Sequence, residues 1–185
     1  MREIEIKVRI DDKAATLAAL ATRGVEMSQP LKQHDVVYSR PGAIDDDPNE
    51  CWLRIRTEND TTHTFTLKRS VTSQQDSIEH EVVFDNPKEM RGIIAQLGYE
   101  LFSDLTKVRQ KGKRGEYEFC VDEIPELGTF LEIEKLCDES ADIDEVRQEL
   151  WALLEPLGIS RDDEETDGYD VLMRKQFSPP ATPAS

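Results

Sequence analysis

Hydrophobic and charged residues alternate over the first ten positions of the chain, MREIEIKVRI. Ile4, Ile6 and Val8 share one face of this segment, and acidic and basic residues occupy the positions between them. A period of two predicts a strand over residues 2–10. By the same criteria, we predict seven more strands over residues 33–39, 51–58, 63–70, 77–85, 103–112, 115–124 and 128–138.

Turn-forming and capping residues separate these strands and mark three or four helices, the last of them a short helix or turn. One of the helices, for example, begins at Pro87 and stops at Gly98. The connections are mostly short, which favours an antiparallel sheet. Without a repeat or a linker, residues 1–177 are predicted to form one domain, and the Pro-rich segment 178–185 a disordered tail. The helices are predicted over residues 12–22, 87–98, 142–158 and 167–177.

Each long strand combines one apolar face with one face of long, mostly charged side chains. A sheet with one face in water explains this pattern for a single strand. For seven strands we favour a closed eight-stranded antiparallel β-barrel with a charged tunnel inside and helices outside, an α+β fold. Trp52 and Trp151 are expected to anchor the core between barrel and helices. The polar positions are Glu3, Glu5, Lys7, Arg9, Arg54, Arg56, Thr64, Thr66, Lys68, Glu79, Glu81, Lys107, Arg109, Lys111, Glu118, Cys120, Asp122, Glu132 and Glu134.

The composition excludes several classes of partner. A formal net charge of -16 over 185 residues opposes binding to nucleic acid or to anionic membranes. No apolar run approaches the ~18 residues of a membrane span. Cys51, Cys120 and Cys137 form no CxxC pair, which favours reduced thiols and a cytoplasmic location. We expect Cys120 and Cys137 to be small core residues.

The polar faces carry groups suited to phosphate chemistry. Arginine offers a planar fork that matches phosphate oxygens. Carboxylates at i and i+2, as in Glu3 and Glu5, lie on one face, and such oxygens suit Mg²⁺ or Mn²⁺. A basic clamp next to a carboxylate-held divalent cation predicts phosphoryl chemistry. The P-loop pattern GxxxxGK[ST] is absent from the sequence.

The ordered motifs resemble those of a known family. EIEIK (3–7) is similar to the ExExK signature of the CYTH superfamily, the triphosphate tunnel metalloenzymes, which includes class IV adenylyl cyclases and thiamine triphosphatases. The resemblance covers roughly residues 1–175 and implies an eight-stranded tunnel. The motifs that follow the first are LRIR (53–56), TLK (66–68), EHE (79–81), KVR (107–109), VD (121–122) and LEIE (131–134).

The resemblance implies roles for individual residues. Lys135 has the wrong parity and is left out, and Lys107 matches less well. Lys175 would cap the tunnel from the terminal helix and bind phosphate. The implied metal ligands are Glu3, Glu5, Glu81, Asp122, Glu132 and Glu134. The implied phosphate-binding residues are Lys7, Arg54, Arg56, Lys68 and Arg109, and the implied catalytic residues are Lys7, Arg54, Arg56 and Asp122. We expect the cations to lower the pKa of neighbouring carboxylates, which keeps them ionised for a metal.

Two reactions suit this scaffold. The segment HDVVYSRPGAIDDDPNECWLRIR and the motif GYDVLM (168–173) resemble the class IV cyclase branch, although Ser39 stands where an aromatic residue is common. That resemblance favours conversion of ATP to cyclic AMP and pyrophosphate. The alternative is a triphosphatase acting on inorganic triphosphate, thiamine triphosphate or nucleoside triphosphates. A silent polyphosphate binder is less favoured because the acids would repel the ligand without a metal. The expected partner is thus a small triphosphate, and a homodimer is left open.

Overall fold

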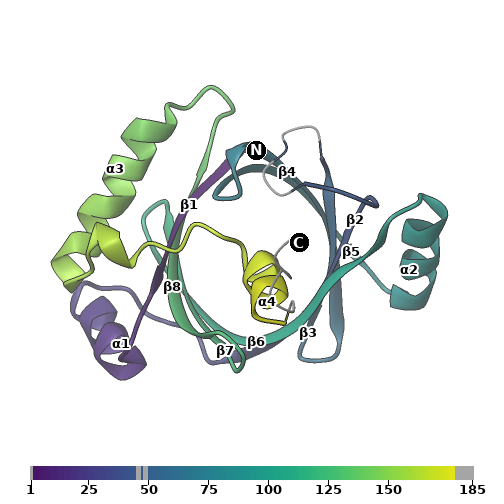
Figure 1. The fold of residues 1–185 in the computed structure, drawn as a ribbon. Coiled ribbons are helices and arrows are strands. Elements are labelled where there is room, and N and C mark those ends of the chain that lie inside the picture. Colours follow the sequence, from purple (N-terminus) through teal and green to yellow (C-terminus); the bar gives the residue numbers. More distant parts are fainter. Residues whose placement is uncertain (1, 45–46, 48–49, 178–185) are drawn as a thin grey trace, which may run out of the picture.

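The computed structural model describes residues 2–44, 47 and 50–177, and the predicted tail lies outside this range. Within it, eight antiparallel strands close into a barrel in the order β1-β5-β4-β3-β2-β6-β7-β8 (Figure 1). The predicted fold class is confirmed. The strands are β1 (Arg2–Arg9), β2 (Leu31–Ser39), β3 (Trp52–Glu58), β4 (Thr62–Ser73), β5 (Asp76–Phe84), β6 (Glu100–Arg114), β7 (Tyr117–Ile124) and β8 (Gly128–Cys137).

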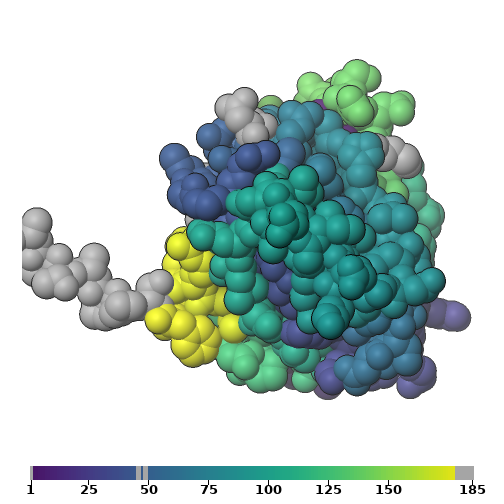
Figure 2. All heavy atoms as spheres, turned by 90° about the vertical axis from the view of Figure 1, so that its right-hand side faces the viewer, coloured from purple at the N-terminus to yellow at the C-terminus, as the bar shows by residue number. Residues whose placement is uncertain are grey.

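The helices lie outside the barrel wall or across one of its ends. In Figure 1, α1 and α3 flank the β1–β8 side, and α2 stands on the opposite side. Figures 1 and 2 together place α4 across one end of the barrel. No helix in the described ranges is long and apolar enough to cross a membrane. The helices are α1 (Lys13–Thr22), α2 (Pro87–Gln96), α3 (Ile143–Leu154) and α4 (Tyr169–Phe177), with short 3₁₀ turns η1 (Glu155–Leu157) and η2 (Arg161–Asp163).

Several element boundaries differ from the prediction. The segment 71–76, predicted as a loop, is largely strand, because β4 and β5 pair out to Ser73 and Asp76. The strand β6 is longer than expected because it pairs with β2 near its start and with β7 near its end. The last long helix ends at Leu154 and continues only as the η1 turn, which contains Pro156. Proline lacks the N–H that a continuing helix needs.

Two of the three apolar clusters lie outside the barrel wall, between strands and helices, and the third joins Leu105, Ile124 and Phe130 to Tyr169 and Leu172 of α4. Ile4, Ile6 and Val8 on β1 are fully buried and belong to a cluster that includes Leu150 and Trp151 of α3. A second cluster joins residues of β2 and β3 to Ile94 of α2. Since the apolar faces point outward into these clusters, the charged faces line the interior. The role predicted for Trp151 is confirmed.

We predict that Gly112→Ala destabilises the barrel. Its added Cβ would lie 2.6 Å from Met27 Sδ and 2.9 Å from the carbonyl oxygen of Glu26. We expect a loss of about 1–3 kcal/mol in the free energy of unfolding, measured with urea. Gly92→Ala in α2 is the matched control, because its Cβ meets nothing within 4 Å. That change should be neutral or stabilise by up to about 1 kcal/mol. Equal stability of both variants would contradict the close approach at Gly112.

Candidate active site

The barrel encloses a cavity of about 530 Å³. Strands from the whole wall contribute to it, and Tyr169 and Asp170 of α4 close one end. Two of the predicted site residues, Asp122 and Lys175, are not part of the lining. The structure brings the remaining predicted residues together around the cavity: Glu3, Glu5, Lys7, Arg54, Arg56, Lys68, Glu81, Arg109, Glu132 and Glu134.

The cations on β3 and β4 are each held by an acid. Arg56 binds Asp35 of β2 through two hydrogen bonds, from Nε and Nη2, both 2.7 Å long. Lys68 Nζ lies 3.1 Å from Glu79, and Arg54 lies 3.6 Å from the same carboxylate. Burial alone would raise the pKa of Asp35, but the charge of Arg56 outweighs it and lowers that pKa. The paired acids thus fix the directions of the guanidinium groups.

Arg54 also carries a donor that no neighbour satisfies. Its Nη2 lies 3.3 Å from Glu81, whereas its Nε is buried without a hydrogen-bond partner among the described residues. Burial would raise the pKa of Glu79, yet Lys68 and Arg54 lower it to about 2. This wall therefore keeps Asp35 and Glu79 ionised, as predicted, and Arg54 retains one donor without a partner among the described residues.

Asp122 lies behind the lining and supports two cations. It is fully buried, accepts from Arg109 Nε at 2.6 Å and accepts from Lys107 Nζ at 3.0 Å. Arg109 also donates to Glu132. The structure thus gives Asp122 the contacts of a positioning residue, with both carboxylate oxygens already engaged.

Sequence reasoning missed several members of the lining. Glu79, Lys107, Lys111 and Glu118 were predicted on the charged faces of their strands without a role of their own, and all four line the cavity. Asp35 was missed because its partner Arg56 comes from another strand. By contrast, Lys135 lies outside as expected and pairs with Glu149 of α3. The other missed lining residues with polar side chains include Ser70, Gln74, Tyr169 and Asp170.

Lys175 and Trp52 lie elsewhere than expected. The Lys175 side chain is 62% exposed and pairs with Asp167. Trp52, predicted as a core anchor, instead lines the cavity, because it shares the parity of Arg54. Its ring packs edge-on against Phe102, with centroids 4.6 Å apart. The Trp52 ring therefore lies two positions from Arg54, an arginine predicted to bind phosphate.

A cluster of unpaired acids lies on the β1–β8 seam. Carboxylate oxygens of Glu3, Glu5 and Glu134 lie within 4.8 Å of one another. Their side chains form no hydrogen bond or ion pair within the described part of the chain. Burial, and then the charge of Glu79, raises the pKa of Glu3 to about 7. Burial, and then Glu3, raises the pKa of Glu134 to about 9, and burial raises that of Glu5. For these three acids, the predicted lowering of the pKa is wrong.

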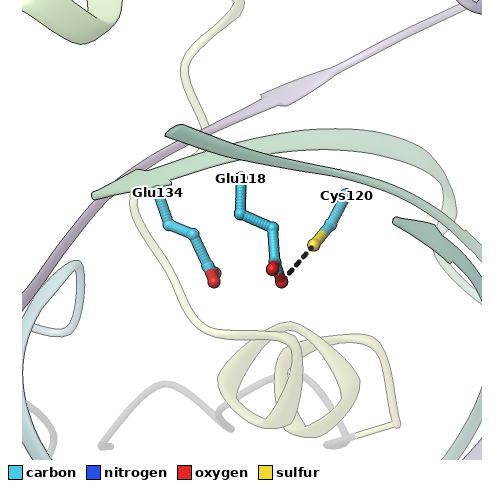
Figure 3. Close-up of side chains that lie close together, drawn as sticks. All are labelled: Glu118, Cys120 and Glu134. Carbon is cyan, nitrogen blue, oxygen red and sulfur yellow. Dashed lines mark hydrogen bonds between the residues drawn. The ribbon is translucent and has the colours of Figure 1, made fainter. Parts of the chain in front are cut away.

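A second group shares Glu134 with this cluster. Figure 3 shows Glu134, Glu118 and Cys120 projecting from neighbouring strands toward the barrel interior. The Cys120 thiol donates to Glu118, whose carboxylate also pairs with Lys111 at 2.6 Å. Cys120 is fully buried, as expected of a small core residue, although it belongs to the charged face. The three-glutamate cluster, with oxygen donors and no cation of its own, fits a hard divalent ion better than this group does.

We predict that the metal-free protein loses stability as pH rises from 5 to 9. The raised pKa values of Glu3 and Glu134 mean that the folded state binds more protons than the unfolded state in this window. The free energy of unfolding therefore falls with rising pH. Glu134→Gln should flatten the slope, measured as thermal midpoints in EDTA.

The acids with lowered pKa values change the free energy of unfolding only below about pH 4.5. They therefore do not affect its slope between pH 5 and 9. Glu149→Gln, outside the barrel, is the control and should keep the wild-type slope. A Glu134→Gln slope equal to that of wild type would show that this carboxylate is already ionised at pH 5.

Comparison with known proteins agrees with this geometry. A protein from Methanocaldococcus jannaschii named "Putative adenylate cyclase" is 32% identical over 165 residues, which cover 88% of this chain and 93% of that protein. A solved structure from Pyrococcus horikoshii has a TM-score of 0.79 at 22% identity and covers 92% of this chain and 98% of its own. A structure from Hippeastrum, described as a "Putative adenylyl cyclase" that "reveals a dominant" triphosphatase activity, has a TM-score of 0.62 at 22% identity and covers 97% and 98%. These two structures support the fold alone. The family model described as the CYTH domain matches residues 1–169, and the chain belongs to this family.

Proposed function

We propose that this protein is a divalent-metal-dependent enzyme that acts on a nucleoside triphosphate in the barrel cavity. The first candidate reaction is conversion of ATP to cyclic AMP and pyrophosphate. One observation carries the proposal. The same cavity contains preoriented cations and, on the β1–β8 seam, three acids that form no ion pair among the described residues.

The cations supply the grip on the phosphates. Arg54, Arg56 and Lys68 face the cavity from β3 and β4, and Lys7, Lys107 and Arg109 face it from β1 and β6. A phosphate oxygen would satisfy the unpaired Nε of Arg54. Because acids already fix the arginines, less side-chain freedom is lost when the substrate binds.

The unpaired acids supply the metal site. Glu3, Glu5 and Glu134 would hold Mg²⁺ or Mn²⁺, since both ions prefer oxygen ligands. The bound ion would neutralise charge on the phosphate oxygens. Glu81 and Glu132 already accept hydrogen bonds from Arg54 and Arg109, and so they border this site rather than form its unpaired centre.

Trp52 favours a nucleoside over inorganic triphosphate. Its ring lines the cavity beside Arg54, where a base could stack on it while the phosphates meet the arginines. The cavity of about 530 Å³ falls within the range that accommodates drug-sized ligands. The cyclase named in M. jannaschii adds support for ATP as the nucleotide.

Hydrolysis is the second candidate. Leu136, which is 55% exposed, and Glu81 both line the cavity, so water reaches this part of it. The activity named for the Hippeastrum protein is in line with this alternative. A metal-free binder is disfavoured because three acids that form no ion pair add nothing to the binding of a bare triphosphate.

Product analysis tests the proposal directly. The purified protein is incubated with ATP, or with inorganic triphosphate, in Mg²⁺ or Mn²⁺, and the products are separated by chromatography. We expect cyclic AMP and pyrophosphate from ATP. Orthophosphate as the main product would show that the reaction is hydrolysis and not cyclisation. No product from either substrate, with either metal, would contradict the cyclase and the hydrolysis of these two substrates, and would favour another triphosphate such as thiamine triphosphate, or a silent binder.

We predict that Glu5→Gln lowers kcat by 100-fold or more at saturating substrate, because a carboxylate needed by the metal is lost. The fold should survive, because the substitution removes an unpaired buried charge. Activity is measured over a titration of Mg²⁺, and folding by circular dichroism. Glu149→Gln is again the control and should retain activity. Wild-type turnover by Glu5→Gln would remove Glu5 from the metal site.

A further inference from the structure

One edge of β1 loses its strand partner halfway along. β8 pairs with β1 from Arg2 to Arg9, but on the other edge the described residues of β5 pair with it only from Arg2 to Ile4. The edge beyond Ile4 carries the backbone groups of Glu5 and Lys7, whose side chains line the cavity. Backbone N–H and C=O groups inside a protein need hydrogen-bond partners. Other parts of the chain must therefore supply them along this edge.

Three contacts complete this edge. Glu5 N donates to the carbonyl oxygen of Gln75 at 2.9 Å, at the turn between β4 and β5. Arg147 Nη1, from α3, donates to the carbonyl oxygen of Glu5 at 3.3 Å. Glu165 N donates to the carbonyl oxygen of Lys7 at 2.8 Å. A turn, a helix side chain and the chain before α4 thus replace the missing strand.

The segment 164–168, which leads into α4, holds Lys7 in two ways. Glu164 forms an antiparallel bridge with Val8 of β1, next to the backbone contact of Lys7. Lys7 also reaches the segment with its side chain, because its Nζ donates to the carbonyl oxygen of Asp167 at 2.5 Å. The segment therefore fixes both the main chain and the ammonium group of Lys7. Any loosening of the segment would change where this cation lies in the cavity.

Gln75 and Arg147 hold the segment 164–168 in place. Gln75 Nε2 donates to the carbonyl oxygen of Glu165 at 2.9 Å, and Gln75 Oε1 accepts from Arg147 Nη1 at 3.2 Å. Arg147 also donates to the carboxylate of Glu164. Gln75 is buried, and neither side chain is part of the cavity lining. The two side chains can therefore act on a bound substrate only through the residues that they hold.

We propose that Gln75 and Arg147 are positioning residues for the reaction in the cavity. Through the segment 164–168, they set the direction of the Lys7 ammonium group toward the phosphate chain. Arg147 also contacts the carbonyl oxygen of Glu5, so one network fixes a metal-site acid relative to a phosphate-binding cation. A displacement of about 1 Å caused far from the chemistry can cost about 100-fold in rate. This inference rests on the proposed function.

Gln75→Met tests this role, because methionine keeps the length of the side chain and loses both of its hydrogen bonds. Kinetics are measured in saturating Mg²⁺ with the triphosphate substrate that the wild type turns over, ATP first. We expect KM to rise about 10-fold and kcat to change less than about threefold, because a displaced Lys7 binds the phosphates less well in the ground state and the transition state alike. Hydrogen exchange of the Glu165 amide should become about 10-fold faster, because the segment opens more often.

Arg147→Met is the second variant, and it should fold because the Arg147 side chain is partly exposed on α3. It should raise KM and also raise the Mg²⁺ concentration for half-maximal activity, because the contact with the carbonyl oxygen of Glu5 is lost. An unchanged Mg²⁺ requirement would overturn the link to Glu5. Gln110→Met is the matched control. Gln110 is not part of the lining, and its Nε2 donates to the carbonyl oxygen of Ser28 at 3.0 Å, so KM and exchange at Glu165 should stay at wild-type values.

The negative outcomes separate this inference from the proposed function. If the wild type turns over a triphosphate and both variants raise KM no more than Gln110→Met does, the positioning role is overturned and the proposed function stands. A raised KM without faster exchange at Glu165 also overturns the role, because the effect would not pass through the segment 164–168. If the wild type neither binds nor turns over a triphosphate, the proposed function fails, and the positioning role fails with it.

Discussion

Charge compensation inside the barrel is the constraint on which the rest of the structure depends. Moving charged side chains out of water is costly, and the cost is met only where each charge finds a well-oriented partner. Asp35 with Arg56, and Asp122 with Arg109 and Lys107, are such arrangements. The pairs hold the cations in fixed directions in the absence of substrate. The same contacts that make the barrel interior possible therefore also prepare it for an anion.

Compensation is incomplete at one place, and that gives the cavity its chemical polarity. Glu3, Glu5 and Glu134 lie close together without an ion pair among the described residues, and the raised pKa values of Glu3 and Glu134 indicate that protons compensate their charge. A divalent cation would displace those protons, which couples metal binding to pH and to stability. The cationic part of the lining and the acidic seam thus differ in what they lack. The cationic side chains can bind phosphate oxygens, and the acidic seam can bind a divalent cation.

Strand parity carries most of what the sequence can predict. The alternation from Glu3 to Arg9 is enough to assign two faces, and its recurrence along the chain led to a closed barrel with a charged interior. Parity placed Lys107 on the tunnel face, and it would also have placed Trp52 there, because Trp52 shares a face with Arg54. What parity cannot supply is pairing across the barrel. The pKa of Glu134 depends on Glu3 from another strand, and the neighbours of Tyr169 come from β1 and β6.

The two candidate reactions would use the same phosphate-binding residues, so they differ in the nucleophile that attacks phosphorus. Water enters wherever the cavity meets solvent, and no special positioning is needed to supply it. A ribose hydroxyl competes only if the nucleoside is held so that this oxygen stays close to phosphorus. Trp52 is the lining residue suited to hold a base, and Phe102 supports its ring. Arg174 of α4 lies over Phe102, with 4.2 Å between its guanidinium carbon and the ring centroid. The helix α4, whose Tyr169 lines the cavity, thus also supports the aromatic pair of Trp52 and Phe102.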